Sequence, residues 1–175
     1  MRYVALLRGI NVGGNTMIKM EKLRKTFEAL GFDNVASYIN SGNLAFDSRK
    51  VSESKLIDKI ETAIEKDFGR PVSVIVREQK EIDHILKNNP FDGEYGSHKE
   101  MHVLFLKSPV PNDKSTQITE AAFEGERYSI NGREIYCHLP TGVADSLLTK
   151  GFIDKKLKLV FTGRNWRTVQ KLAEM

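Results

Sequence analysis

The sequence predicts an α+β protein made of two ferredoxin-like halves with antiparallel sheets, the second half incomplete. Residues 1–77 have the order strand, helix, strand, strand, helix, strand, which is the split β-α-β pattern. Residues 99–175 begin a similar series, lack a clear final strand and end in helices. A short helix and a polar linker over residues 78–98 join the halves, and 175 residues are enough for two small domains.

Short apolar runs indicate the strands of the first half, and apolar residues three or four positions apart indicate its helices. Gly31 and Gly69 stand where helix C-caps are expected, and Ser41-Gly42 is a hairpin signal. The expected elements are a strand over 2–8, a glycine loop over 9–15, a helix over 20–30, strands over 35–40 and 43–47, a helix from 52 or 54 to 68, and a strand over 71–77.

In the second half, Asn131-Gly132 is typical of a type I′ hairpin turn. Thr162 is expected to cap a last helix that presents Trp166, Val169 and Leu172 on one stripe, which favours core packing of the tryptophan. Residues 142–159 have a helical pattern, which Gly151 weakens because glycine disfavours a helix interior. The expected elements are a helix with Ile82, Ile85 and Leu86 on one face, a strand over 101–107, a helix over 114–123, strands over 127–130 and 134–139, and helices over 142–159 and after 162.

Composition places the chain among ordinary globular proteins, with 40% hydrophobic and 29% charged residues. No apolar run approaches the ~20 residues of a membrane span, and the N-terminus lacks the features of a signal peptide. Cys137 is the only cysteine, which suits a reducing compartment and favours a buried structural thiol. A cytoplasmic location without membrane association is therefore expected.

The charge is distributed unevenly along the chain. Residues 1–30 carry six Lys/Arg against two Asp/Glu, residues 31–148 carry 14 against 19, and residues 149–175 carry seven against two. Two basic ends therefore flank an acidic middle. If both ends lie on one side, they form a positive face for an anion; the alternative is a set of solvated helix faces.

Three separated motifs are similar to a known family. They are Ala5-Leu6-Leu7-Arg8-Gly9-Ile10-Asn11-Val12-Gly13-Gly14, Ser37-Tyr38-Ile39-Asn40-Ser41-Gly42-Asn43, and Thr162-Gly163-Arg164-Asn165-Trp166-Arg167-Thr168-Val169-Gln170-Lys171-Leu172. In this order they resemble the bacterial domain-of-unknown-function family 1697, over nearly the whole chain. The resemblance implies two ferredoxin-like halves and no assigned activity, so no catalytic residue is transferred from it.

The predicted topology brings two motif loops together. A right-handed crossover makes the first and second strands parallel, so the loops that follow them leave from the same edge of the sheet. The connection before the fourth strand returns to that edge. The candidate ligand-binding residues are Arg8, Asn11, Gly13, Gly14, Lys19, Asn40, Ser41, Asn43 and Arg70, with Asn15 beside them.

These residue types suit a small anionic or phosphate-bearing ligand. Glycine loops expose backbone N–H groups, and a helix that begins near Lys19 adds positive potential at its N-terminus. The planar guanidinium of Arg8 suits a phosphate or carboxylate. The pattern matches neither the Walker loop nor the dinucleotide fingerprint. Acylphosphatases share the topology and use an Arg-bearing loop, an analogy at the level of fold alone. The alternative is that the glycines and asparagines only shape turns.

A second candidate patch mixes basic residues with an aromatic: Arg164, Asn165, Trp166 and Arg167. Such surfaces bind nucleic acid, which makes a nucleic-acid-binding module with basic ends the first alternative. An RNA-recognition surface also needs stacked aromatics on its central strands, and only Tyr3 and Phe46 are available. A protein-interaction domain without a ligand is the second alternative.

The sequence assigns no reaction, cofactor or metal. His98 and His102 stand four apart in an expected strand, ~13 Å from each other, too far to share one ion. No nucleophile-elbow pattern or pair of carboxylates occurs in the motif loops. A site made of Arg, Asn and Ser favours binding or electrostatic stabilisation over acid–base chemistry. Ligand identity and oligomeric state are left open.

Overall fold

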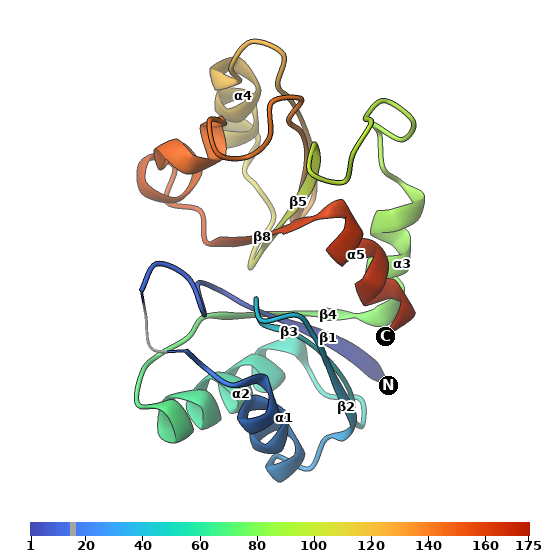
Figure 1. Cartoon of the computed structure of the whole chain (residues 1–175), viewed down its shortest axis with the longest axis vertical. Helices are drawn as coiled ribbons and strands as arrows, with labels where there is room; N and C mark the ends of the chain where they lie inside the picture. The colour runs from blue at the N-terminus through green and yellow to red at the C-terminus, as the bar shows by residue number, and fades with distance from the viewer. Residues whose placement is uncertain (15–16) are drawn as a thin grey trace. The chain divides into compact units, whose positions relative to one another are not determined.

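The chain folds into two compact units, whose elements are labelled in Figure 1. The computed structural model describes residues 1–14 and 17–175. The first unit comprises residues 1–86 together with 171–175, and the second comprises residues 87–170. Each contains one four-stranded antiparallel sheet, so the predicted α+β class with two ferredoxin-like halves is confirmed.

The first unit has the complete ferredoxin-like order. Its elements are β1 (Arg2–Leu7), α1 (Met20–Ala29), β2 (Asp33–Tyr38), β3 (Asn43–Asp47), α2 (Glu53–Phe68) and β4 (Val74–Glu78), after which α3 (Gln79–Lys87) begins. The strand order is β2-β3-β1-β4. Figure 1 shows α1 and α2 together on one face of this sheet.

The core of the first unit lies between the sheet and these two helices. Side chains alternate across a strand, so Tyr3, Ala5 and Leu7 of β1 face the same layer. They pack with Phe27 of α1 and Ile60 of α2, all of them buried. Apolar residues spaced three or four apart put one stripe of each helix against the sheet.

Strand directions place three connections at one end of this sheet. β1 and β2 each pair antiparallel with β3, so they are parallel to each other, and β4 is antiparallel to β1. The register pairs Leu6 with Asn43 and Leu7 with Val74. The end of β1 therefore lies beside the starts of β3 and β4.

The second unit repeats the strand order. Its elements are β5 (Met101–Leu106), α4 (Asn112–Ala121), β6 (Arg127–Asn131), β7 (Glu134–His138), the 3₁₀ turn η1 (Leu147–Lys150), the π-helical turn η2 (Phe152–Lys156) and β8 (Phe161–Asn165), followed by α5 (Trp166–Glu174). The sheet order is β6-β7-β5-β8. This unit is thus incomplete at its second helix, which two short turns replace.

The expectation that this half lacks a final strand is wrong. β8 pairs antiparallel with β5 from His102–Asn165 to Leu106–Phe161. Its buried positions are Thr162 and Arg164, polar residues that conceal the alternation of a strand. Asn165, rather than Thr162, caps α5, because its Oδ1 accepts the N–H of Thr168 at 3.0 Å.

Two further local predictions need correction. The helix expected over 142–159 is instead η1 and η2, separated at Gly151, which has a left-handed φ of 73°. The β6–β7 turn is one residue later than expected, since Asn131 pairs with Glu134. Gly132, with φ 59°, is then the first central residue, where type II′ turns carry glycine.

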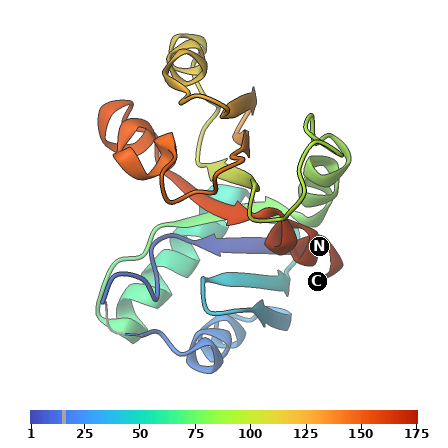
Figure 2. The same ribbon diagram turned by 45° about the horizontal axis from the view of Figure 1, so that its top comes forward.

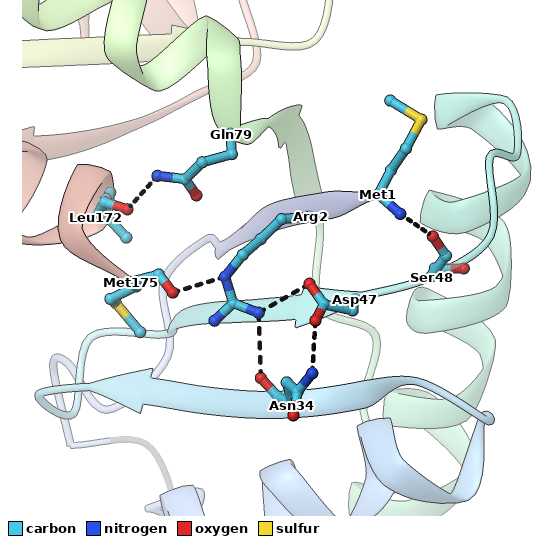
Figure 3. A network of polar contacts seen from close by, with 8 residues as sticks. All are labelled: Met1, Arg2, Asn34, Asp47, Ser48, Gln79, Leu172 and Met175. Atoms are coloured by element: carbon cyan, nitrogen blue, oxygen red, sulfur yellow. Dashed lines mark hydrogen bonds and ion pairs between the residues drawn. The ribbon is translucent and has the colours of Figure 1, made fainter.

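The C-terminal residues of the first unit are bound to its first strand, as Figure 3 shows. Arg2 donates from Nε to the Met175 carbonyl at 2.6 Å and from Nη1 to Asp47 Oδ1 at 2.9 Å. Gln79 donates to the carbonyl of Leu172 at 2.9 Å. Asn34 donates to the other Asp47 oxygen, Oδ2, at 2.7 Å. The hydrogen bonds from Asn34 and Arg2 lower the pKa of the Asp47 carboxyl. Residues 171–175 are therefore bound to β1 through Arg2 and to α3 through Gln79.

Candidate functional site

Three connections meet at one end of the first sheet. Figure 2 shows the β1–α1 loop, the β2–β3 hairpin loop and the α2–β4 connection at that end. Leu7 donates its N–H to the Gly42 carbonyl at 2.8 Å, and Arg8 donates its N–H to the Ser73 carbonyl at 2.9 Å. The backbone that ends β1 is therefore joined to both neighbouring connections.

Asn11 joins the β1–α1 loop to the hairpin. Its Oδ1 accepts the Ile18 N–H at 2.7 Å, and its Nδ2 donates to the Ile18 carbonyl at 3.0 Å and to the Asn40 carbonyl at 2.8 Å. Its φ of 55° is left-handed, a conformation that asparagine adopts more readily than most residues. We call these three residues, Asn11, Ile18 and Asn40, the Asn11 clamp. The expected meeting of the two motif loops is present in these contacts.

Gly42 sits at the closest approach of hairpin and loop. A Cβ added there would lie 2.6 Å from Leu7 Cβ and 3.0 Å from Ile10 Cδ1, and φ is 84°. Both the space and the backbone conformation require glycine. This residue therefore allows the hairpin to lie directly on the end of β1.

Asn43 and Ser41 shape the hairpin from within. Asn43 is fully buried, and its Nδ2 donates to the Tyr38 carbonyl at 3.0 Å and to Ser41 Oγ at 2.8 Å. Its amide is thus used inside the turn. Of the predicted residues, Asn11 and Asn43 have identified structural roles, whereas the Asn40 side chain is exposed.

The basic candidates lie on two of the connections at this end of the sheet, Arg8 and Lys19 on the β1–α1 loop and Arg70 on the α2–β4 connection. Arg8 is half-buried and directly follows β1. Lys19 is exposed, follows Ile18 of the clamp, and is the N-cap of α1, where no side chain caps the helix. Arg70 is half-buried and follows Gly69, the left-handed C-cap of α2.

The remaining candidates lie in the β1–α1 loop. Gly13 and Gly14 are exposed there. Asn15 lies outside the described residues. Hydrogen bonds join Asn11 to Asn40 and Asn43 to Ser41. Arg8 follows Leu7, whose N–H binds the Gly42 carbonyl, and Lys19 follows Ile18 of the clamp.

The converging segments are basic. The three connections, residues 8–19, 39–42 and 69–73, together hold three Arg or Lys and no Asp or Glu. A carboxylate from α2, that of Glu61, reaches this end and accepts the Val74 N–H at 2.8 Å. The excess of cationic side chains with exposed loop backbone suits an anion.

Most residues of the second candidate patch are buried or hydrogen-bonded within the fold. Arg164 is buried, donates to Thr162 Oγ1 at 2.7 Å and to the Gly163 carbonyl at 2.8 Å, and burial lowers its pKa to about 10. Trp166 is also buried, with its ring edge-on to Tyr95 at 6.5 Å, as its helical stripe predicted. Asn165 caps α5, which leaves Arg167 as the exposed member.

The aromatic residues considered for RNA stacking lie in the core. Tyr3 and Phe46 stack on each other with ring centroids 5.7 Å apart, and both belong to the helix-covered layer of the first unit. A base has no access to a ring buried in this layer. These two aromatics therefore do not form a recognition platform.

The second unit contains a buried polar cluster that sequence reasoning missed. Glu126 accepts the Tyr128 hydroxyl at 2.8 Å and the Leu147 N–H at 3.3 Å, which anchors η1. Burial raises the pKa of Tyr128, and the hydrogen bond to Glu126 adds to it. Cys137 is fully buried, as expected, and burial followed by the Glu126 charge raises the pKa of its thiol. No signal in the sequence distinguishes Glu126 from a surface glutamate.

His102 is a second unexpected feature of this unit. It lies opposite Cys137 in the β5–β7 register. Burial, with a smaller effect of His98, lowers the pKa of His102 to about 4. Its Nδ1 is buried without a hydrogen-bond partner among residues 1–14 and 17–175. The imidazole is therefore neutral at pH 7.

Other binding features lie away from the candidate residues. A groove of about 560 Å³ between α1 and α2 is lined by Thr26, Leu30, Lys59 and Asp67 among others, and by none of the candidates. Within the described part of the chain, no cluster of three His, Cys, Asp or Glu could hold a metal ion. No helix in that part has the length and apolarity to cross a membrane.

The fold and these loops define a two-unit α+β protein with a basic, glycine- and asparagine-bearing edge on its first sheet. The family model described as "Protein of unknown function (DUF1697)" matches residues 1–136. The chain therefore belongs to this family. A solved structure, "conserved bacterial protein SP0830 from Streptococcus pneumoniae", is 27% identical with a TM-score of 0.74, over 99% of this chain and 97% of that chain. No curated protein matches the chain.

Proposed function

We propose that this protein binds a small anionic or phosphate-bearing ligand where the β1–α1 loop meets the β2–β3 hairpin. The observation that carries the proposal is the 2.8 Å hydrogen bond from Asn11 to the Asn40 carbonyl. It fixes two glycine-bearing loops against each other beside Arg8. A preformed arrangement of this kind lowers the ordering cost of binding.

Each remaining candidate has a chemical part in this proposal. The guanidinium of Arg8 suits a phosphate or carboxylate in bidentate geometry. The N-terminus of α1, which no side chain caps, adds N–H donors and positive potential beside Lys19. None of the candidate residues is a histidine or a carboxylate, so the site favours binding and electrostatic stabilisation over proton transfer.

A thermal-shift panel tests the proposal. Its ligands are inorganic phosphate, phosphate monoesters, acyl phosphates, nucleotides, dicarboxylates and short single-stranded oligonucleotides. Each is titrated at low and moderate salt against wild type and the Arg8→Ala and Arg8→Lys variants. A ligand at 100 times its Kd stabilises the fold by about 2.7 kcal/mol, which raises Tm by several degrees for a chain of this size. We expect one class of compact anion to do so, with the shift lost in Arg8→Ala and reduced in Arg8→Lys.

Arg49→Ala is the matched control, because Arg49 is an exposed arginine of the first unit outside the converging segments. An equal loss in this variant would indicate general charge effects and contradict a site at Arg8. The panel also separates the two alternatives. A response limited to oligonucleotides, falling steeply with salt, would favour a nucleic-acid-binding module that uses the basic ends. A flat panel would favour protein interaction.

A further inference from the structure

The most exposed large apolar side chains of the described chain gather at the proposed anion site. Met17, Val12 and Ile39 are 64%, 56% and 52% exposed, against 45% for the next, Met1. Each is the sequence neighbour of a residue in the Asn11 clamp, whose members are joined by side-chain hydrogen bonds. Consecutive Cα atoms are ~3.8 Å apart, so all three side chains start within one residue of the same junction.

Folding does not account for Ile39. Its φ is 48°, and a β-branched residue in this left-handed region is a conformational outlier. Its side chain is also more than half exposed, so it gains little from packing. Glycine or asparagine would suit this turn position better on both counts. An isoleucine that is both strained and exposed indicates a role at the surface.

We propose that the ligand of this site is an amphiphilic anion, namely a phosphate monoester with a short alkyl or aryl group. Its head lies with Arg8, and its apolar group covers Ile39, Val12 and Met17. Charge complementarity supports an anionic head, since the converging segments hold Arg and Lys but no Asp or Glu. This inference rests on the proposed function and names the chemical class of its ligand.

A homologous series of ligands tests the inference. Methyl, propyl and pentyl phosphate are titrated by calorimetry below their aggregation concentrations. A fully buried methylene contributes ~0.8 kcal/mol, and a site open on one side buries about half of it, so affinity should rise about twofold per methylene. We expect Ile39→Asn and Met17→Ser to flatten this rise without changing methyl phosphate affinity. Arg8→Ala should weaken all three ligands by a similar factor.

Val160→Ser is the matched control, because Val160 is an exposed valine of the second unit, 42% exposed; it should leave the series unchanged. Affinity that depends on Arg8 but not on chain length would overturn this inference and leave the proposed function standing. A rise that survives both Ile39→Asn and Met17→Ser would also overturn it.

Two outcomes would contradict the small-anion site itself as well as its apolar part. Absence of binding for all three phosphates would overturn this inference together with the proposed function. Binding to anionic phospholipid vesicles, with no binding of pentyl phosphate, would replace the small ligand with a lipid surface.

Discussion

Replacing Gly42 with alanine tests how closely the hairpin must approach the end of β1. The new Cβ would lie 2.6 Å from Leu7 Cβ and 3.0 and 3.1 Å from two carbons of Ile10. Leu7 Cβ is held by its own strand and cannot rotate away. The backbone at position 42 also has a φ of 84°, which disfavours any side chain.

The expected loss combines two costs. A left-handed conformation costs a non-glycine residue roughly 1–2 kcal/mol, and an extra carbon in a packed interior costs about 1–3 kcal/mol. Gly42→Ala should therefore lower the free energy of unfolding by about 2–5 kcal/mol. Gly69→Ala is the matched control, because Gly69 has a φ of 70° but nothing within 4 Å of its Cβ position. It should lose only the cost of the left-handed conformation, about 1–2 kcal/mol.

Urea unfolding followed by far-UV circular dichroism measures both variants. Because two units can unfold separately, hydrogen exchange of the Leu7 amide, which donates to the Gly42 carbonyl, gives a local measure in the first unit. Gly42→Ala should speed this exchange far more than Gly69→Ala does. Equal losses in the two variants would refute the claim that close approach, rather than φ alone, requires glycine at position 42.

Three other predictions follow from single side chains. Asn11→Gly keeps the φ of 55° accessible and removes three hydrogen bonds, so it should cost about 2 kcal/mol in urea unfolding; a loss below about 0.5 kcal/mol would contradict the clamp. Ile39→Asn should instead raise stability by about 1 kcal/mol, because asparagine relieves the strain, and a lower Tm would count against that reading. The pKa of His102 is about 4 in the fold against an ordinary 6.5. Between these two values the unfolded chain protonates His102 and the folded chain does not. The free energy of unfolding should therefore be highest above pH 6.5 and fall by roughly 3 kcal/mol as the pH drops to 4. His102→Gln should flatten that part of the pH profile, and an unchanged profile in this variant would contradict the assignment.

The sequence predicted the elements whose apolar pattern matches their burial. The strand expected over 43–47 is β3, and the helix expected from residue 20 is α1, because Leu23 and Phe27 are both apolar and buried. β8 was missed because its buried positions hold Thr162 and Arg164. Arg164 is compensated by hydrogen bonds to Thr162, two residues away, and to the Gly163 carbonyl, which hydrophobicity alone does not reveal.

The position of the candidate site followed from topology, whereas the roles of its asparagines did not. Parallel β1 and β2 require their following loops to share one end of the sheet, whatever the side chains are. Asn11 and Asn43 were grouped with Asn40 because an amide has the same chemistry inside a turn and facing a ligand. Only the contacts of Asn11 with Ile18 and of Asn43 with Tyr38 separate these roles.

A purely structural role for the motif loops explains some of these residues and leaves others unexplained. It accounts for Asn11, Gly42 and Asn43, whose hydrogen bonds and close contacts build the junction. It gives no reason for a strained, exposed Ile39, nor for converging segments that carry Arg and Lys without Asp or Glu. If the loops only shaped a turn, Ile39→Asn would improve the protein at no cost. If they hold an amphiphilic anion, the same change should raise stability and lower affinity together, and one variant measured in both assays decides between the two accounts.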